Sequence, residues 1–131
     1  MGDYLMSLIK ANNITNTTGG IPTVKSQQLI PTAWVNFNGT SGTSIRDSEN
    51  VSSVVDIATG RWDVNFTVAL ANANYAVTVG SNDTTNIGSA SGAGPYTFAH
   101  TTTDFTFVNI NYQGSYTALT SLSAIVMGGQ A

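Results

Sequence analysis

A single histidine is the first place to look for chemistry in this chain of 131 residues. His100 precedes Asp104 by four positions, and a histidine oriented by a carboxylate is the general base of hydrolases that use a serine nucleophile. In one large class of these enzymes the serine sits on a sharp G-x-S-x-G turn, and the sequence contains no such motif. We therefore interpret His100, which is followed by three threonines, as a polar residue at the end of a strand.

Metal and acid–base sites have little support either. One histidine and no cysteine exclude zinc sites built from several His or Cys ligands. The oxygen-rich segment Asn82–Asn86 has fewer carboxylates than calcium loops normally carry. Asp56 and Asp63 flank a predicted hairpin and raise the question of a glycosidase, but a surface ion pair with Arg61 is the simpler interpretation. We expect no enzymatic activity, no cofactor and no metal site.

Aromatic side chains are better candidates for recognition. Tyrosine and tryptophan combine a large apolar ring with a polar group, which suits them to binding surfaces. The candidate contact residues for a glycan or a protein partner are Trp34, Tyr96, Tyr112 and Tyr116. The alternative is that most of these rings pack in the core or at a subunit interface, and both interpretations stay open at this point.

Charge is scarce in this chain, which limits its partners. Only 8% of the residues are charged, and the formal net charge is −3 at pH 7. The basic residues are scattered along the chain, at Lys10, Lys25, Arg46 and Arg61. Nucleic acids and anionic membrane surfaces are bound by clustered Lys and Arg, so we expect neither as a partner.

Alternation of apolar and polar residues predicts β-strands. It is clearest in residues 61–68, where Trp62, Val64, Phe66 and Val68 are expected to face inward. Residues 51–57 precede this segment by a short Gly-containing connection, so the two are expected to form a hairpin. Residues 32–38 also alternate, with Ala33, Val35 and Phe37 on one face. Further strands are expected at residues 43–46, 75–79, 96–99, 105–112 and 121–127. The predicted fold is all-β, an antiparallel, jelly-roll-like β-sandwich of about eight strands with an extended N-terminal arm.

The chain is expected to divide into an arm and one domain. Residues 1–31 have little capacity to form a core, and we interpret them as an attachment arm, with residues 32–131 forming the sandwich. Residues 80–95 are expected to form a loop, long enough to be functional or mobile. In residues 105–112 both faces are partly apolar, which favours a central strand or one that faces a neighbouring subunit.

Two stretches resemble virion structural proteins of tailed bacteriophages. Residues 33–79 contain AWVNFNGTSGTSIRDSENVSSVVD, TGRWDVNFT and ANYAVTV, which are similar to a module of tail-fibre and other phage structural proteins. The opening SLIKANNITNTTGGIPTV is similar to the start of cyanophage virion proteins. The resemblance implies a tail-fibre-like or appendage module of the virion, made in the host cytoplasm, and by analogy a homotrimer. It brings no catalytic residues with it.

Other roles remain open beside this one. The chain could be a capsid decoration (cement) protein or a head fibre, in which residues 1–31 anchor it to other virion proteins. It could also be a glycan-binding module that recognises host surface polysaccharide through exposed aromatic side chains. An enzyme acting on surface glycans is the fourth interpretation and would need two carboxylates in one cleft.

Overall fold

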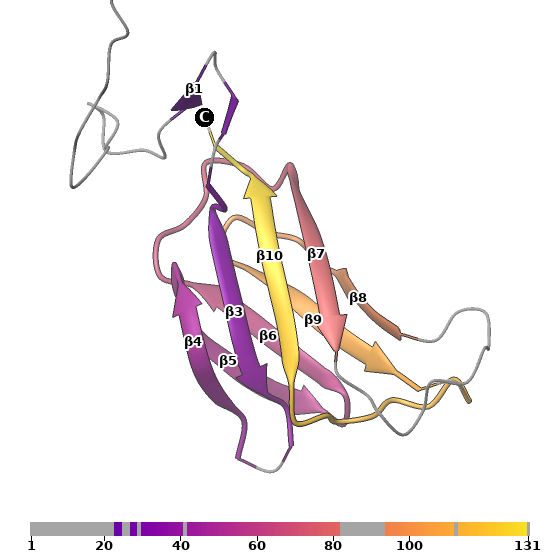
Figure 1. The fold of residues 1–131 in the computed structure, drawn as a ribbon. Coiled ribbons are helices and arrows are strands. Elements are labelled where there is room, and N and C mark those ends of the chain that lie inside the picture. The colour runs from indigo at the N-terminus through magenta and orange to yellow at the C-terminus, as the bar shows by residue number, and fades with distance from the viewer. Residues whose placement is uncertain are drawn as a thin grey trace, which may run out of the picture.

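The computed structural model describes residues 23–24, 27–28, 30–40, 42–81, 94–111 and 113–130 (Figure 1). These residues contain ten strands and no helix. The strands are β1 (Thr23–Val24), β2 (Gln27–Gln28), β3 (Ala33–Asn38), β4 (Ser44–Glu49), β5 (Val51–Ala58), β6 (Arg61–Phe66), β7 (Tyr75–Ser81), β8 (Gly94–Phe98), β9 (Asp104–Ile110) and β10 (Leu122–Gly128). β1 and β2 pair only with each other, so the main fold is built from the other eight.

Eight strands form two antiparallel sheets that pack face to face. The first sheet has the order β4-β3-β10-β7 and lies in front in Figure 1; the second has the order β5-β6-β9-β8 and lies behind it. Three hairpins, β3–β4, β5–β6 and β8–β9, stay within one sheet, and the remaining connections between these eight strands cross from one sheet to the other. The prediction of an all-β, antiparallel sandwich of about eight strands is confirmed.

Three aromatic rings form the centre of the core between the sheets. Phe37 comes from the first sheet, and Trp62 and Phe107 come from the second. Their centroids lie 5.4–6.0 Å apart with steep interplanar angles, the edge-to-face arrangement that aromatic pairs prefer. Gly39 makes room for this packing, because a Cβ there would lie 2.5 Å from Cζ2 of Trp62. Apolar side chains from both sheets surround the rings.

The predicted alternation is confirmed in β3 and β6, with one exception at the end of β6. Trp62, Val64 and Phe66 are buried as expected, whereas Val68 is 67% exposed, so its predicted inward orientation is wrong. β6 ends at Phe66 because the chain then turns toward Asn50. The backbone N–H of Val68 donates to the side-chain oxygen of Asn50 at 2.8 Å, which draws this residue away from the sheet.

Several predicted boundaries shift in the structure. The strand predicted at 43–46 extends to Glu49 as β4, because it pairs with most of β3. The expected loop at 80–95 is shorter at both ends, since Gly80 and Ser81 belong to β7 and Gly94 and Pro95 to β8. Residues 82–93 lie outside the described residues, as does most of the predicted arm at 1–31.

The strand predicted at residues 105–112 to have two partly apolar faces is β9, and it is central in its sheet, which was one of the two alternatives expected for it. β9 lies between β6 and β8, and all five residues from Phe105 to Asn109 are buried. Phe105 and Phe107 face the core between the sheets. Thr106 and Val108 point to the outer face, so something on that face must cover them.

Phe66 tests the register of β6. Its ring packs against Tyr75 at 5.8 Å and Phe105 at 5.9 Å, so Phe66→Ala is expected to lower the free energy of unfolding by ~3–5 kcal/mol. Asn65 points to the outer face and donates to Ser53 at 3.1 Å, so Asn65→Ala should cost about 1 kcal/mol or less. Urea denaturation measures both losses. Small and equal losses would contradict the register.

Candidate functional site

The outer face of the β5-β6-β9-β8 sheet carries an arginine surrounded by aromatic side chains. We call Arg61, Tyr96, Phe98 and Tyr116 the arginine–aromatic cluster. In the strand register Val108 lies opposite both Arg61 and Tyr96, and side chains directly opposite each other share one face of a sheet. Phe98 follows Tyr96 by two residues and therefore points to the same face.

Two aromatic rings hold the Arg61 guanidinium. Its central carbon lies 5.5 Å from the ring centroid of Phe98 and 5.5 Å from that of Tyr116, within the range of cation–π attraction. The rings of Tyr96 and Phe98 lie 6.4 Å apart at 34°. Each of the three rings remains 39–48% exposed, so the cluster combines apolar surface with one positive charge in contact with solvent.

The cluster covers an apolar floor. Val108 is fully buried although it points away from the core between the sheets. Thr106, the next outward residue on β9, is also buried, and its hydroxyl donates to the Asp63 carboxylate at 2.8 Å. Solvent is therefore excluded from the centre of this outer face, and the aromatic rings of the cluster lie around that centre.

A tight turn after β9 positions Tyr116. The Asn111 side-chain oxygen accepts hydrogen bonds from the backbone N–H groups of Gln113 and Ser115, an arrangement that reverses the chain. Tyr116 then pairs with Ile110 as an isolated antiparallel bridge. The chain thus returns beside the end of β9 and brings the Tyr116 ring to Arg61.

Gly60 sets how closely this returning segment approaches. The side chain of the buried Asn109 donates to the backbone oxygen of Thr117 at 3.0 Å, and the Asn109 N–H donates to the Gly60 oxygen at 2.9 Å. A Cβ at Gly60 would lie 2.5 Å from the Thr117 backbone nitrogen. With φ of +69°, this position also favours glycine by its backbone conformation.

The charges within the cluster are only partly compensated. The buried Nε of Arg61 has no hydrogen-bond partner, and Arg61 forms no ion pair within the described residues. Partial burial raises the pKa of Tyr96 above its ordinary value, and the charge and the hydroxyl of Tyr116 act in the same direction. The positive charge of Arg61 opposes these effects. Tyr96 is therefore a neutral hydroxyl at physiological pH.

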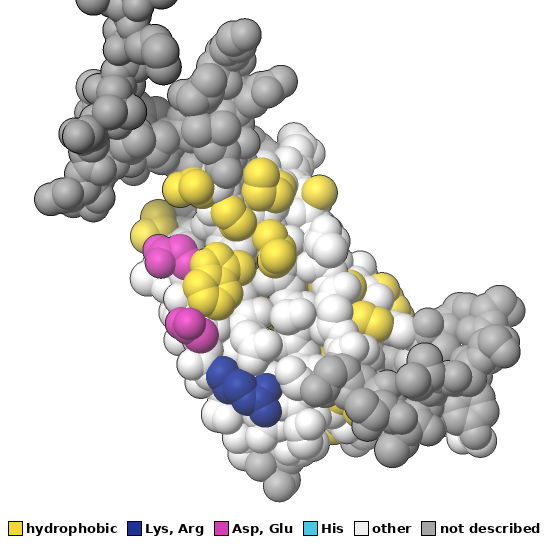
Figure 2. Space-filling view, viewed as in Figure 1, with side chains coloured by type: hydrophobic (Ala, Val, Ile, Leu, Met, Phe, Trp, Pro, Cys, Tyr) yellow, Lys and Arg dark blue, Asp and Glu magenta, His cyan; other side chains and the backbone are white. Residues whose placement is uncertain are grey.

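Trp34 lies on the outer face of the other sheet. It is opposite Ile125 in the register, and Met127 follows on the same face of β10. We call Trp34, Ile125 and Met127 the tryptophan patch. Ile125 is 46% and Met127 39% exposed. Figure 2 shows hydrophobic side chains gathered on this face, with acidic side chains at their edge.

The structure unites half of the predicted contact residues. Tyr96 and Tyr116 meet in the arginine–aromatic cluster, Trp34 lies on the opposite side of the sandwich, and Tyr112 lies outside the described residues. Sequence reasoning missed Arg61 and Phe98 as members of the site. The spacing of Phe98 from Tyr96 on one strand was a usable signal, whereas the pairing that brings Arg61 to them was not readable from local pattern.

His100 packs on aromatic rings at one end of the sandwich. Its ring stacks on Tyr75 at a centroid distance of 4.8 Å, and its Nε2 lies 2.9 Å from the Thr97 hydroxyl. The Tyr75 hydroxyl donates to the backbone oxygen of Asp104 at 2.9 Å. Burial, followed by the Asp104 charge, raises the pKa of Tyr75 to about 12. The Asp104 carboxylate accepts a hydrogen bond from Thr103 at 2.8 Å.

The acidic residues do not converge. The expected ion pair of Arg61 with Asp56 or Asp63 is absent. Asp56 lies opposite the inward Trp62. Asp63 shares the outer face with Arg61, but its carboxylate accepts a hydrogen bond from Thr106. Among the described residues, no group of three or more His, Cys, Asp or Glu side chains could hold a metal ion. The oxygen-rich segment 82–86 lies outside them. No helix in the described part of the chain has the length and apolar character needed to cross a membrane.

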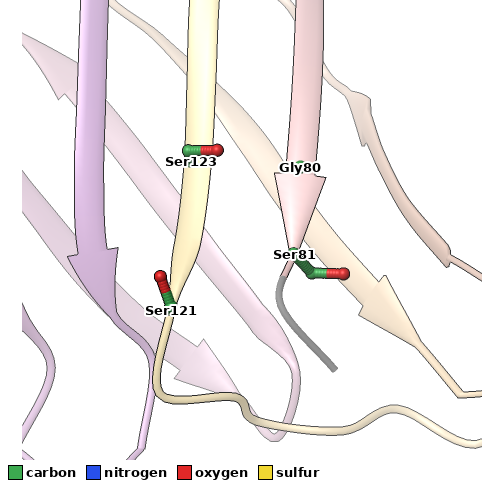
Figure 3. Close-up of a pocket in the computed structure, with 4 residues that line it drawn as sticks. All are labelled: Gly80, Ser81, Ser121 and Ser123. Carbon is green, nitrogen blue, oxygen red and sulfur yellow. The ribbon is translucent and has the colours of Figure 1, made fainter. Parts of the chain in front are cut away.

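A small hollow of about 220 Å³ lies between the ends of β7 and β10 (Figure 3). Gly80, Ser81, Ser121 and Ser123 line it. The three serines carry hydroxyls, and none of the four residues has a charged side chain, so the hollow offers only hydrogen-bonding groups to a ligand. The arginine–aromatic cluster is therefore the stronger candidate site.

Comparisons with protein-family models, curated proteins and solved structures found no match for the chain. The described residues define it as an antiparallel β-sandwich with two unlike outer faces, one bearing the tryptophan patch and the other the arginine–aromatic cluster. What the chain does must be argued from these faces, because a sandwich by itself does not specify a function.

The role of Gly60 gives a prediction with a matched control. Gly60→Ala should destabilise the domain and displace Tyr116, since the added carbon meets backbone atoms. Gly42 has a similar φ of +80° with nothing within 4 Å, so Gly42→Ala should cost only the backbone term of ~1–2 kcal/mol. Urea denaturation compares the two variants. Equal losses would contradict the close approach of the returning segment.

Proposed function

We propose that this chain is a structural domain of a bacteriophage particle, a tail-fibre-like or appendage module displayed on the virion. The observation that carries the proposal is the tryptophan patch on the outer face of the β4-β3-β10-β7 sheet. The resemblance of residues 33–79 to a module of phage structural proteins supports it.

The tryptophan patch favours assembly with other protein. An antiparallel sheet that faces water normally alternates apolar inward and polar outward. β10 departs from this pattern, because Ile125 and Met127 are apolar on the outward side while Ala124 and Val126 are buried on the inward side. Tryptophan and methionine are enriched in protein interfaces, and Trp34 lies directly beside Ile125. A neighbouring subunit that covers the patch would remove this apolar surface from water.

The proposed partners are copies of the chain itself and other virion proteins. Closed cyclic symmetry is the common solution for homo-oligomers, and the resemblance to phage fibre modules favours a trimer. Attachment to the particle through residues 1–31 remains part of the proposal, with most of that segment outside the described residues. A decoration protein of the capsid would use the same two features, with the arm on the shell lattice.

A glycan-binding module is the second candidate function, and the arginine–aromatic cluster favours it. Three partly exposed rings lie together on one face, which is the kind of surface on which sugar rings stack. The two candidates are compatible, because the two features lie on different sheets. One face would hold the domain in the particle while the other faces the host.

Self-association tests the assembly proposal. Light scattering of the purified protein is expected to give the mass of a trimer at micromolar concentration. The double variant Ile125→Thr with Met127→Thr should give a monomer, because it removes apolar contact area and adds a hydroxyl at each position.

Val55→Thr is the matched control for this experiment. Val55 is also about half exposed, but it lies on the outer face of the second sheet, so this variant should remain a trimer. A monomeric wild-type protein, or a double variant that stays trimeric, would contradict the proposal.

A further inference from the structure

We propose that the arginine–aromatic cluster binds an acidic sugar, a pyranose ring that carries a carboxylate. The inference rests on the second candidate function, the glycan-binding module, and names the class of sugar that it would take. It depends on the geometry of four side chains on the outer face of the β5-β6-β9-β8 sheet.

The rings supply a stacking surface for the sugar. Tyr96, Phe98 and Tyr116 each leave 39–48% of their surface exposed, although all three contact their neighbours in the cluster. The buried Val108 lies under them and fixes the floor of the site. Aromatic side chains of this kind bury large apolar area at little cost in side-chain freedom. An apolar face of a pyranose ring can therefore be desolvated here.

Arg61 supplies the specificity for a carboxylate. The Phe98 and Tyr116 rings lie at equal distances from its guanidinium and restrict its movement. Its positive charge has no ion-pair partner within the described residues. A planar guanidinium recognises a carboxylate through two parallel N–H···O bonds, which a neutral sugar hydroxyl does not offer. The free charge beside a stacking surface thus points to a ligand with both an apolar ring face and a carboxylate.

The acidic residues on this face leave room for such a ligand. Asp63 lies opposite Thr106 and accepts its hydrogen bond, and Asp104 lies opposite Asn65, farther along β9. In the register Tyr96 is level with Arg61, because both lie opposite Val108, and Tyr116 lies beyond them, opposite Ile110. A ligand that stacks on the two tyrosines therefore approaches Arg61 from the side away from both carboxylates.

Nucleic acid fits the cluster less well, although it also combines rings and negative charge. Affinity for a phosphate backbone grows with the number of Lys and Arg residues that contact it. The cluster has one arginine. Among the described residues the only other Lys or Arg is Arg46, and Arg46 lies on β4 in the other sheet. A single carboxylate on a sugar matches a single guanidinium.

An NMR titration of the isolated, isotope-labelled protein tests the inference. The probe is a hexamer of galacturonic acid, and its fully methyl-esterified form is the neutral counterpart with the same rings. We expect saturable shifts of the Arg61 Nε–H signal and of the backbone signals of Tyr96, Phe98 and Tyr116 with the acid. The affinity for the ester should be lower by about tenfold or more, because the ester loses the charge-assisted pair with Arg61.

Two variants with the same change in net charge provide the control. Arg61→Gln should weaken binding of the acid about tenfold or more, whereas Arg46→Gln should leave it unchanged. Arg46 is exposed on β4, where it donates to Asn36 and Phe37. Well-dispersed spectra establish that each variant is folded, and Tyr96→Ala serves as a second variant if Arg61→Gln unfolds.

Three results would overturn the inference: no saturable shifts with the acid, equal affinity for the acid and the ester, or equal weakening by the two arginine variants. Such a failure is distinguishable from a failure of the assembly proposal. The latter depends on the tryptophan patch on the other sheet and is measured by the mass of the oligomer.

Discussion

The packing of Phe37, Trp62 and Phe107 between the sheets is the constraint on which the rest of this structure depends. These three edge-to-face rings come from both layers, so they set the separation of the sheets and the residues that must face inward. Because side chains alternate along a strand, each inward ring also decides which neighbours point outward. Arg61 is at the outer surface because Trp62 is in the core, and Trp34 is at the other surface because Ala33 and Val35 are inside.

The two outer faces suggest a division of roles. On the first sheet, Trp34, Ile125 and Met127 present aliphatic and aromatic surface, which a neighbouring protein subunit can cover. On the second sheet, the rings of the arginine–aromatic cluster surround a charge that has no ion-pair partner, which suits a polar ligand better than a protein core. A structural domain held by one face and displayed by the other is the account that uses both observations.

Local pattern predicted much of the fold and less of the site. Alternation identified β3 and β6 and their inward residues, since burial of one face leaves a period of two in the sequence. It failed at Val68, where a hydrogen bond to the Asn50 side chain draws the chain away from the sheet. It could not join Arg61 to Tyr96 and Tyr116, because that contact depends on which strands are neighbours and on a turn at Asn111. Pairing between distant strands is set by the whole core and leaves no local signal.

The most direct test of the proposed role is cryo-electron microscopy of the virus particle in which the proposal places the chain. The account predicts density for the sandwich at the tail or an appendage, with the tryptophan patch against a neighbouring subunit and the arginine–aromatic cluster facing outward. The same orientation over the capsid lattice would assign the chain as a decoration protein. A particle that lacks the chain, or one in which the tryptophan patch faces solvent, would contradict the account.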